Sequence, residues 1–407
     1  MERFTSLKGQ GLVFLSLLFF VWFLNFTGRA IFSPILPLIE DEFQISHARA
    51  SSIFVFQSLG YGMSIFFSGF FSGRFGYKRS IMLSLIVSSL IFFWIPFVKA
   101  FSILYVCSFV IGLATGVYLP SAIPLITSYF EEKLWGRSIA IHDSAASIAV
   151  FAASFVALFL LQFFNWRGIF NVVGVAFILT ALIFYFLFDE LKIGRVNRAV
   201  LGSFIRQRSL WLMSVIWAFA AGTSMGVYFI VPLYLTKELF LDIAYANTIF
   251  GLSRIGGVVV AVSSGFLVNR FSLQKLMVSL LVISGVFTIS VALVSTKFMG
   301  LALFLQASFI YGFFPVGLVT ISRIFEMEVR GMATGFILGI GIIIGWGVVP
   351  YLLGLSGDLL SFRFGILMLG IAVVLSSGLV FLLQGLPLPE PVPLLKSTII
   401  SKSQEET

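Results

Sequence analysis

The sequence predicts an all-α membrane protein with twelve transmembrane helices arranged as two pseudo-symmetric six-helix bundles. The first observation is composition: the 407 residues are 59% hydrophobic and 11% charged, and they include 49 phenylalanines. With a mean hydropathy of +1.08, the chain carries more apolar surface than a water-soluble core could bury. The second is that apolar stretches long enough to cross a bilayer recur twelve times. The third is that the two halves of the sequence repeat each other.

The twelve apolar stretches are expected to be helices. A backbone in hydrocarbon must satisfy its own hydrogen bonds, and the stretches lack the alternation that is typical of barrel strands. The first stretch has no small-residue cleavage site and is followed by eleven more, so we expect a retained helix in place of a signal peptide. The expected spans are 11–38, 50–72, 80–98, 101–128, 138–162, 169–188, 210–235, 246–268, 276–295, 300–322, 332–355 and 364–385.

The positive charges predict the orientation of these spans. With a cytoplasmic N-terminus, eighteen of the 26 Lys and Arg residues fall on the inside, six fall on the outside, and Arg29 and Arg254 lie within spans. This positive-inside bias predicts a multi-pass protein of the plasma membrane with both termini in the cytoplasm. Topology thus explains the pI of about 9.7, and no nucleic-acid partner is expected.

The internal repeat predicts the domain organisation. Residues 60–79 align with 256–275 at an offset of 196, which superimposes Gly60 on Gly256 and Arg74 on Arg270. We therefore expect two homologous six-helix halves joined by a polar linker. The predicted boundaries are 1–188 for the N-terminal half, 189–209 for the cytoplasmic linker, 210–385 for the C-terminal half and 386–407 for a cytoplasmic tail.

The segment GFFSGRFGYKR at 69–79 resembles the loop signature G-x-L-A-D-R-x-G-R-K of the major facilitator superfamily. Glycine replaces the aspartate of the signature at Gly73, and the second copy, GFLVNRFSLQK at 265–275, matches less well. The resemblance implies a transporter that exposes a midplane site alternately to either side as one half rocks against the other. It also implies that this loop acts in gating, whereas the alternative is that its cations only set topology. The implied gating residues are Gly69, Gly73, Arg74, Gly76, Lys78, Arg79, Gly265, Asn269 and Arg270.

Arg29 is the first candidate substrate ligand. Apolar residues continue from it to Ile39, which places the guanidinium about 15 Å inside the span at the helical rise. An arginine at such depth costs about 2.5–3.5 kcal/mol and usually faces a cavity or a partner. Arg29 stands eight residues before Pro37, a spacing similar to that of the organophosphate antiporters and organic anion symporters of the same superfamily. The alternative is a structural arginine that reaches the interface.

Arg254 is the second candidate, expected in the outer half of its span, where Asp242 of the preceding loop could reach toward it. Two arginines in opposite halves suit an anion held between them, because the planar guanidinium matches carboxylate or phosphate oxygens. Polar or aromatic residues at helical spacing in other spans could line the same pathway, although each alone could equally serve packing. These residues are Gln57, Tyr61, Tyr228, Tyr311 and Trp346.

Asp143 and His142 are the candidates for proton coupling. A carboxyl group with restricted solvation and a histidine that titrates near neutrality could together carry a proton coupled to the substrate. The alternative is that Asp143 pairs with Arg137 or with a cation of the cytoplasmic loops.

Several chemistries are excluded by what the sequence lacks. Cys107 is the only cysteine, no phosphate-binding G-x-x-x-x-G-K-[ST] motif occurs, and the two histidines form no cluster with metal-ligand spacing. No enzyme activity, cofactor or metal is therefore expected. The leading hypothesis is a monomeric secondary transporter of a small organic or inorganic anion, driven by proton symport or exchange. A proton-driven exporter of hydrophobic or cationic compounds and a non-transporting membrane sensor are the alternatives.

Overall fold

The computed structural model describes residues 4–187, 204–268 and 270–383 of the chain. Within these ranges twelve helical segments are long and apolar enough to cross a membrane, and each overlaps one of the twelve expected spans. The expected fold class is therefore confirmed. Most of the predicted linker, 189–209, and all of the predicted tail, 386–407, lie outside the described residues.

The first half contains six spans, several of which are built from two consecutive helices. In chain order its elements are α1 (Gln10–Ala30), α2 (Phe32–Phe43), α3 (His47–Ser51), α4 (Ile53–Phe75), α5 (Tyr77–Trp94), the 3-10 turn η1 (Ile95–Phe97), α6 (Phe101–Gly116), α7 (Tyr118–Tyr129), α8 (Glu132–Leu161) and α9 (Trp166–Leu187).

The second half contains the other six spans and three π-helical segments, η3, η4 and η6. In chain order its elements are η2 (Phe204–Arg206), α10 (Arg208–Ala221), η3 (Gly222–Gly226), α11 (Val227–Leu233), η4 (Tyr234–Glu238), α12 (Ile243–Leu252), α13 (Ile255–Leu267), α14 (Leu273–Leu293), η5 (Thr296–Phe298), α15 (Met299–Tyr311), α16 (Phe313–Ile324), α17 (Met327–Ile342), η6 (Ile343–Val348), α18 (Val349–Leu359), α19 (Phe362–Ser376) and η7 (Ser377–Leu382).

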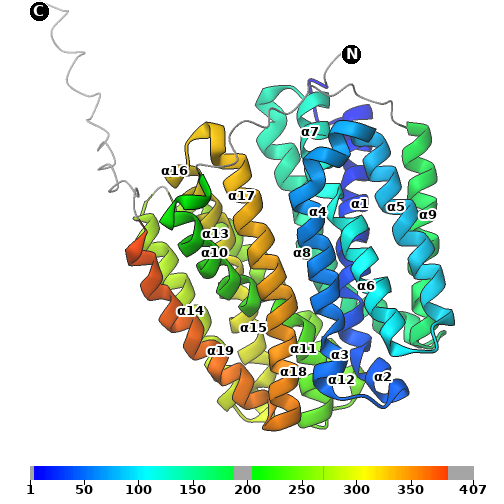
Figure 1. Ribbon diagram of the computed structural model, residues 1–407, viewed down its shortest axis with the longest axis vertical. Helices are drawn as coiled ribbons and strands as arrows, with labels where there is room; N and C mark the ends of the chain where they lie inside the picture. Colours follow the sequence, from blue (N-terminus) through cyan, green and yellow to red (C-terminus); the bar gives the residue numbers. More distant parts are fainter. Residues whose placement is uncertain (1–3, 188–203, 269, 384–407) are drawn as a thin grey trace, which may run out of the picture.

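The packing within each half follows one scheme. In the first half α4 packs on α6, α1 on α8 and α5 on α9; in the second half the equivalent pairs are α13 on α15, α10 on α17 and α14 on α19. Figure 1 shows the two resulting bundles side by side. The repeat seen in the sequence is thus also a repeat of helix contacts.

Prolines explain why three of the spans are broken. Proline has no N–H to offer the carbonyl four residues before it, and its ring clashes with that carbonyl. The helices α1, α6 and α15 each end four residues before a proline, at Pro34, Pro120 and Pro315 respectively. Pro120 and Pro315 occupy equivalent positions in the two halves, so the break between α6 and α7 recurs between α15 and α16.

Glycines bring α4 and α6 into direct backbone contact. A Cβ added at Gly112 would lie 2.0 Å from the carbonyl oxygen of Gln57, and one added at Gly60 would lie 2.1 Å from that of Phe109. Small residues permit such approach between membrane helices, where packing contributes much of the association energy. The closest helix pair of the first half therefore depends on the absence of side chains at two positions.

Replacing Gly112 with alanine is expected to lower the stability of the protein by about 1–3 kcal/mol, because the added methyl group forces the two helices apart. The measurement is thermal unfolding of the purified protein in detergent. Gly136→Ala is the matched control, since a Cβ there has no atom within 4 Å and alanine favours a helix over glycine. Equal melting temperatures of the two variants would contradict this account of the contact.

The two bundles meet at the end of the molecule where α3, α12 and α18 lie, which we call the distal end. There α3 packs on α18, α2 on α11 and α8 on α12, while α4 contacts η6 and α17 closer to the middle. The ring of Phe54 stacks on that of Phe229 across the halves, with centroids 4.1 Å apart. The distal end is thus closed in this conformation.

Candidate functional site

Arg29 is buried at the contact between the halves, one residue before the proline break that ends α1. Its side chain is 3% exposed. Three rings flank the guanidinium, with centroids 4.4 Å from Cζ for Phe26, 4.0 Å for Tyr61 and 5.6 Å for Trp346. Phe26 and Tyr61 belong to the first half and Trp346 to the second. Stacked rings cover the faces of a guanidinium and leave its N–H edges available to a ligand.

The charge of Arg29 has no counter-charge in the described part of the chain. Its Nε donates to the carbonyl of Asn25, 3.4 Å away in the same helix, and its Nη2 has no hydrogen-bond partner. Arg29 forms no ion pair with any described residue. A buried cation without an anion is strongly destabilising, so the geometry favours a site that is completed by an anionic ligand.

Arg254 is a second buried cation of the same kind. It interrupts the span between α12 and α13, is 3% exposed, and has no partner for Nε, Nη1 or Nη2. Its Cζ lies 4.9 Å from the ring centroid of Tyr228 and 5.1 Å from that of Phe250, and Tyr311 is near enough to interact electrostatically. The structure therefore places Arg254, Tyr228 and Tyr311 together, as a second group separate from the rings around Arg29.

One expectation about Arg254 needs correction. The residue lies just on the outer side of the middle of the 25-residue span Ile243–Leu267, in the half where the sequence placed it. The expectation that Asp242 reaches toward it is wrong. The Asp242 carboxylate instead accepts hydrogen bonds from the backbone N–H groups of Ala244 and Tyr245, at 2.8 and 3.2 Å, and so caps α12.

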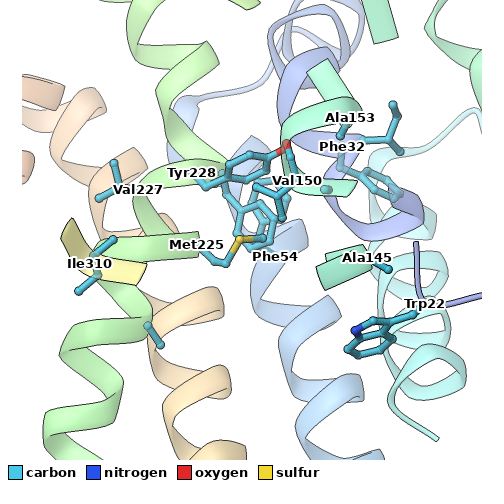
Figure 2. Close-up of a cluster of buried hydrophobic side chains, with 14 of the residues drawn as sticks. Trp22, Phe32, Phe54, Ala145, Val150, Ala153, Met225, Val227, Tyr228 and Ile310 are labelled. Carbon is cyan, nitrogen blue, oxygen red and sulfur yellow. The ribbon is translucent and has the colours of Figure 1, made fainter. Parts of the chain in front are cut away.

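Tyr228 connects the Arg254 group to the first half. Because Pro232 has no N–H, the carbonyl of Tyr228 is free for another donor, and Ser33 Oγ donates to it at 2.8 Å. The Tyr228 hydroxyl donates to the carbonyl of Val150 in α8, at 3.2 Å. Figure 2 shows its ring extending from α11 to Val150, with Phe54 nearby. Both hydrogen bonds cross between the halves.

The remaining polar candidate of the second span, Gln57, is 4% exposed, and within the described part of the chain its side chain makes no hydrogen bond to Arg29. Tyr61, one turn later, is the residue of this helix face that reaches the guanidinium. The structure thus brings together Arg29, Tyr61 and Trp346.

Asp143 and His142 are adjacent in sequence but point into different surroundings. His142 is fully buried, its Nε2 lies 3.0 Å from the Tyr118 hydroxyl, and its Nδ1 has no partner. Because that hydroxyl donates to the carbonyl of Leu18, the imidazole must donate from Nε2. Asp143 is exposed, has no ion pair among the described residues, and interacts electrostatically with Tyr61. The carboxyl group, and not the imidazole, therefore faces the Arg29 group.

The predicted gating loop is mostly helix. The helix α4 continues to Phe75, so Gly69, Gly73 and Arg74 lie in its last two turns, and the side chains of 68–75 are outside the described set. The backbone breaks at Gly76, whose φ of 86° favours glycine.

Beyond that break, the other predicted gating residues occupy separate positions. Lys78 Nζ lies 5.1 Å from the ring centroid of Tyr185, and Arg79 is in the first turn of α5. In the second copy, Gly265 is inside α13 and Arg270 is exposed, while Asn269 falls outside the described residues.

Charged residues at the distal end form a network that the sequence did not predict. We call it the distal clasp; its members are Glu40, Asp41, His47, Lys237 and Asp358. Glu40 is 5% exposed, and its carboxylate lies 2.8 Å from His47 Nδ1 and 3.8 Å from Lys237 Nζ of the second half. Lys237 also pairs with Asp41. The Asp358 carboxylate accepts hydrogen bonds from the backbone N–H groups of His47 and Ala48, at 2.8 and 2.9 Å.

The distal clasp predicts the effect of Asp358→Asn. An uncharged amide at this site weakens the bonds that cap α3 from the opposite half, so the distal end should open more often. The substitution should lower the free energy that holds the distal end closed by about 1.5 kcal/mol. We therefore expect maleimide to label the cysteine of Ser51→Cys roughly tenfold faster when Asp358→Asn is also present. Ser51 is fully buried beside Gly354 of the second half, and Cys107 is replaced by serine in every variant.

Asp242→Asn is the matched control, because that carboxylate also caps a helix but does so within one half. Equal labelling rates for the two variants would show that the distal clasp does not hold the halves together.

Comparisons with known proteins agree with this architecture. The family model described as Major Facilitator Superfamily matches residues 18–313. A TsgA homolog from Erwinia tasmaniensis is 24% identical over 59% of this chain, and a probable L-galactonate transporter from Escherichia coli is 24% identical over 66%. These matches cover 61% and 63% of the two relatives, so the chain spans less than two thirds of their length.

Solved structures show the same fold. A bacterial homolog of the human lysosomal transporter Spinster, in an inward-facing conformation, superimposes with a TM-score of 0.77 at 16% identity, covering 92% of this chain and 97% of that one. The family match covers well over half of the sequence, and the repeated packing of six helices agrees with it. The chain belongs to the Major Facilitator Superfamily.

Proposed function

We propose that this protein is a secondary active transporter that moves a small organic or inorganic anion by alternating access, with proton symport or exchange as the driving reaction. Family membership groups it with membrane transporters and not with enzymes. The resemblance to a probable L-galactonate transporter supports an anionic substrate, because galactonate carries a carboxylate.

One observation carries the anion proposal. Arg29 and Arg254 are both buried, and neither guanidinium meets a carboxylate among the described residues. A bound anion supplies the missing counter-charge, whereas a cationic drug would be repelled by both groups. This charge arrangement favours the anion carrier over the exporter of cationic compounds.

The proposed mechanism uses the two halves, 1–188 and 210–385, as rocking bodies. The positive-inside bias puts the distal end outside the cell, both termini in the cytoplasm and the protein in the plasma membrane. In this orientation the closed distal end blocks access from outside, and the signature residues at the ends of α4 and α13 act on the cytoplasmic side. Asp143, which is exposed and faces Tyr61, is the group we propose for carrying the coupled proton. A single chain contains all of these parts.

The test is a thermal-shift screen of the purified full-length protein with L-galactonate, benzoate, inorganic phosphate and tetraphenylphosphonium. A ligand at a hundred times its dissociation constant adds about 2.7 kcal/mol of stability. Stabilisation by one of the anions, followed by its uptake into proteoliposomes, supports the proposal. Stabilisation by the lipophilic cation alone would favour the exporter, and anion binding without uptake would favour a sensor.

A further inference from the structure

Trp346 is held in place from both halves by the glycines on either side of it. A Cβ added at Gly345 would lie 2.5 Å from the Cβ of Ala221, so this side of η6 rests on α10 and η3. A Cβ added at Gly347 would lie 3.2 Å from the Cα of Val55, so the other side rests on α4 of the first half. The backbone that carries the indole is therefore packed between the two halves.

The π-helical form of η6 fits a functional role for this position. Such segments contain an extra residue in a helical turn and occur often at functional sites. Trp346 also precedes Pro350 by four residues, as Tyr228 precedes Pro232 and Tyr311 precedes Pro315. The aromatic residues of the candidate site in the second half thus share one sequence pattern, an aromatic residue followed four positions later by proline.

Two side chains that lie next to each other at this point each carry an unpartnered hydrogen-bond donor. The indole Nε1 of Trp346 is buried without an acceptor, and so is the Nη2 of Arg29. The indole ring is 5.6 Å from the guanidinium Cζ. Buried donors are rarely left unpaired, and two of them from opposite halves need an acceptor that offers more than one lone pair.

We infer that one anionic head group binds between these donors, with an oxygen on the Arg29 guanidinium of the first half and an oxygen on the Trp346 indole N–H of the second half. The inference rests on the proposed transport of an anion and adds the residue of the second half that selects the head group. A carboxylate and a phosphate share the required chemistry, since each presents two oxygens in a fixed geometry. A bound anion then joins the halves directly, which couples occupancy to their relative position.

The test uses Trp346→Phe, which keeps an aromatic ring beside Arg29 and removes only the N–H donor and part of the ring. Affinities for L-galactonate, benzoate and inorganic phosphate are measured by thermal-shift titration of the full-length protein. The variant loses one hydrogen bond to a charged group. We therefore expect the probe that binds wild type to bind Trp346→Phe roughly tenfold to hundredfold more weakly. The carboxylate probes and inorganic phosphate distinguish the two kinds of head group.

Trp217→Phe is the matched control, because Trp217 is a buried tryptophan of the second half that packs against Gly317 and Gly341, away from Arg29. This variant should bind the probe as wild type does. If wild type binds a probe and Trp346→Phe binds it equally well, the inference is overturned and the anion carrier stands. If wild type binds none of the three probes, the anion-carrier proposal fails and this inference with it.

Discussion

Replacing Arg29 with glutamine is expected to reduce anion affinity by about 2–5 kcal/mol, a loss of roughly thirtyfold to several thousandfold. The guanidinium is 3% exposed and has an N–H edge without a partner, so a bound anion meets little competing water there. Arg29→Lys keeps the charge but not the planar pair of donors, and it should recover only part of the loss. The measurement is a thermal-shift titration with the probe that binds wild type, followed by uptake into proteoliposomes.

The same substitution should raise stability when no anion is bound, which separates this account from a purely structural one. In the unliganded protein the charge of Arg29 is buried without a counter-charge, and its removal relieves that penalty. We therefore expect Arg29→Gln to melt at or above the temperature of wild type in anion-free buffer. Arg49→Gln, at an exposed position of α3, is the control for loss of one positive charge. A variant that unfolds more easily without ligand would indicate that Arg29 holds the fold together.

Arg254→Gln is expected to have the second large effect, a loss of anion affinity that also falls near 2–5 kcal/mol. Three guanidinium nitrogens of Arg254 lack partners, and Tyr228 and Phe250 cover it as other rings cover Arg29. Uptake of the probe anion is the direct measurement, with Arg49→Gln again as the control.

The double variant decides whether the two arginines act on one anion. If both contact the same bound molecule, the combined loss should differ from the sum of the single losses by about 0.5–3 kcal/mol. An unchanged affinity in Arg254→Gln would place this residue outside the binding site and leave Arg29 as the arginine that binds the anion.

Much of the fold was predictable because the bilayer limits the possibilities. Apolar length alone located each span, since it does not depend on contacts between distant residues. The burial of Arg29 was predictable for a similar reason, because the apolar segment continues well beyond it. The break at Ser253 and Arg254 was not expected, because no proline marks it in the sequence.

What the sequence could not supply were contacts between residues far apart in the chain. Glu40 and Lys237 belong to different halves, and the Asp358 carboxylate caps a helix more than 300 positions earlier. The rings around the two guanidinium groups come from several spans. Because the chain contains 49 phenylalanines, its composition does not indicate which aromatic residues contact the arginines. One local signal was available: Tyr228, Tyr311 and Trp346 each stand four residues before a proline.

The two bonds of Tyr228 to the opposite half make its position dependent on conformation. Separation of the halves at the distal end must break the bond from Ser33 to its carbonyl and the bond from its hydroxyl to Val150. The phenol then loses the restraints that keep it over Arg254, and this cation becomes hydrated. If closure of the distal end tightens the binding of an anion to the dehydrated, ring-covered guanidinium, then the bound anion must stabilise the closed distal end by the same free energy, because such coupling is reciprocal.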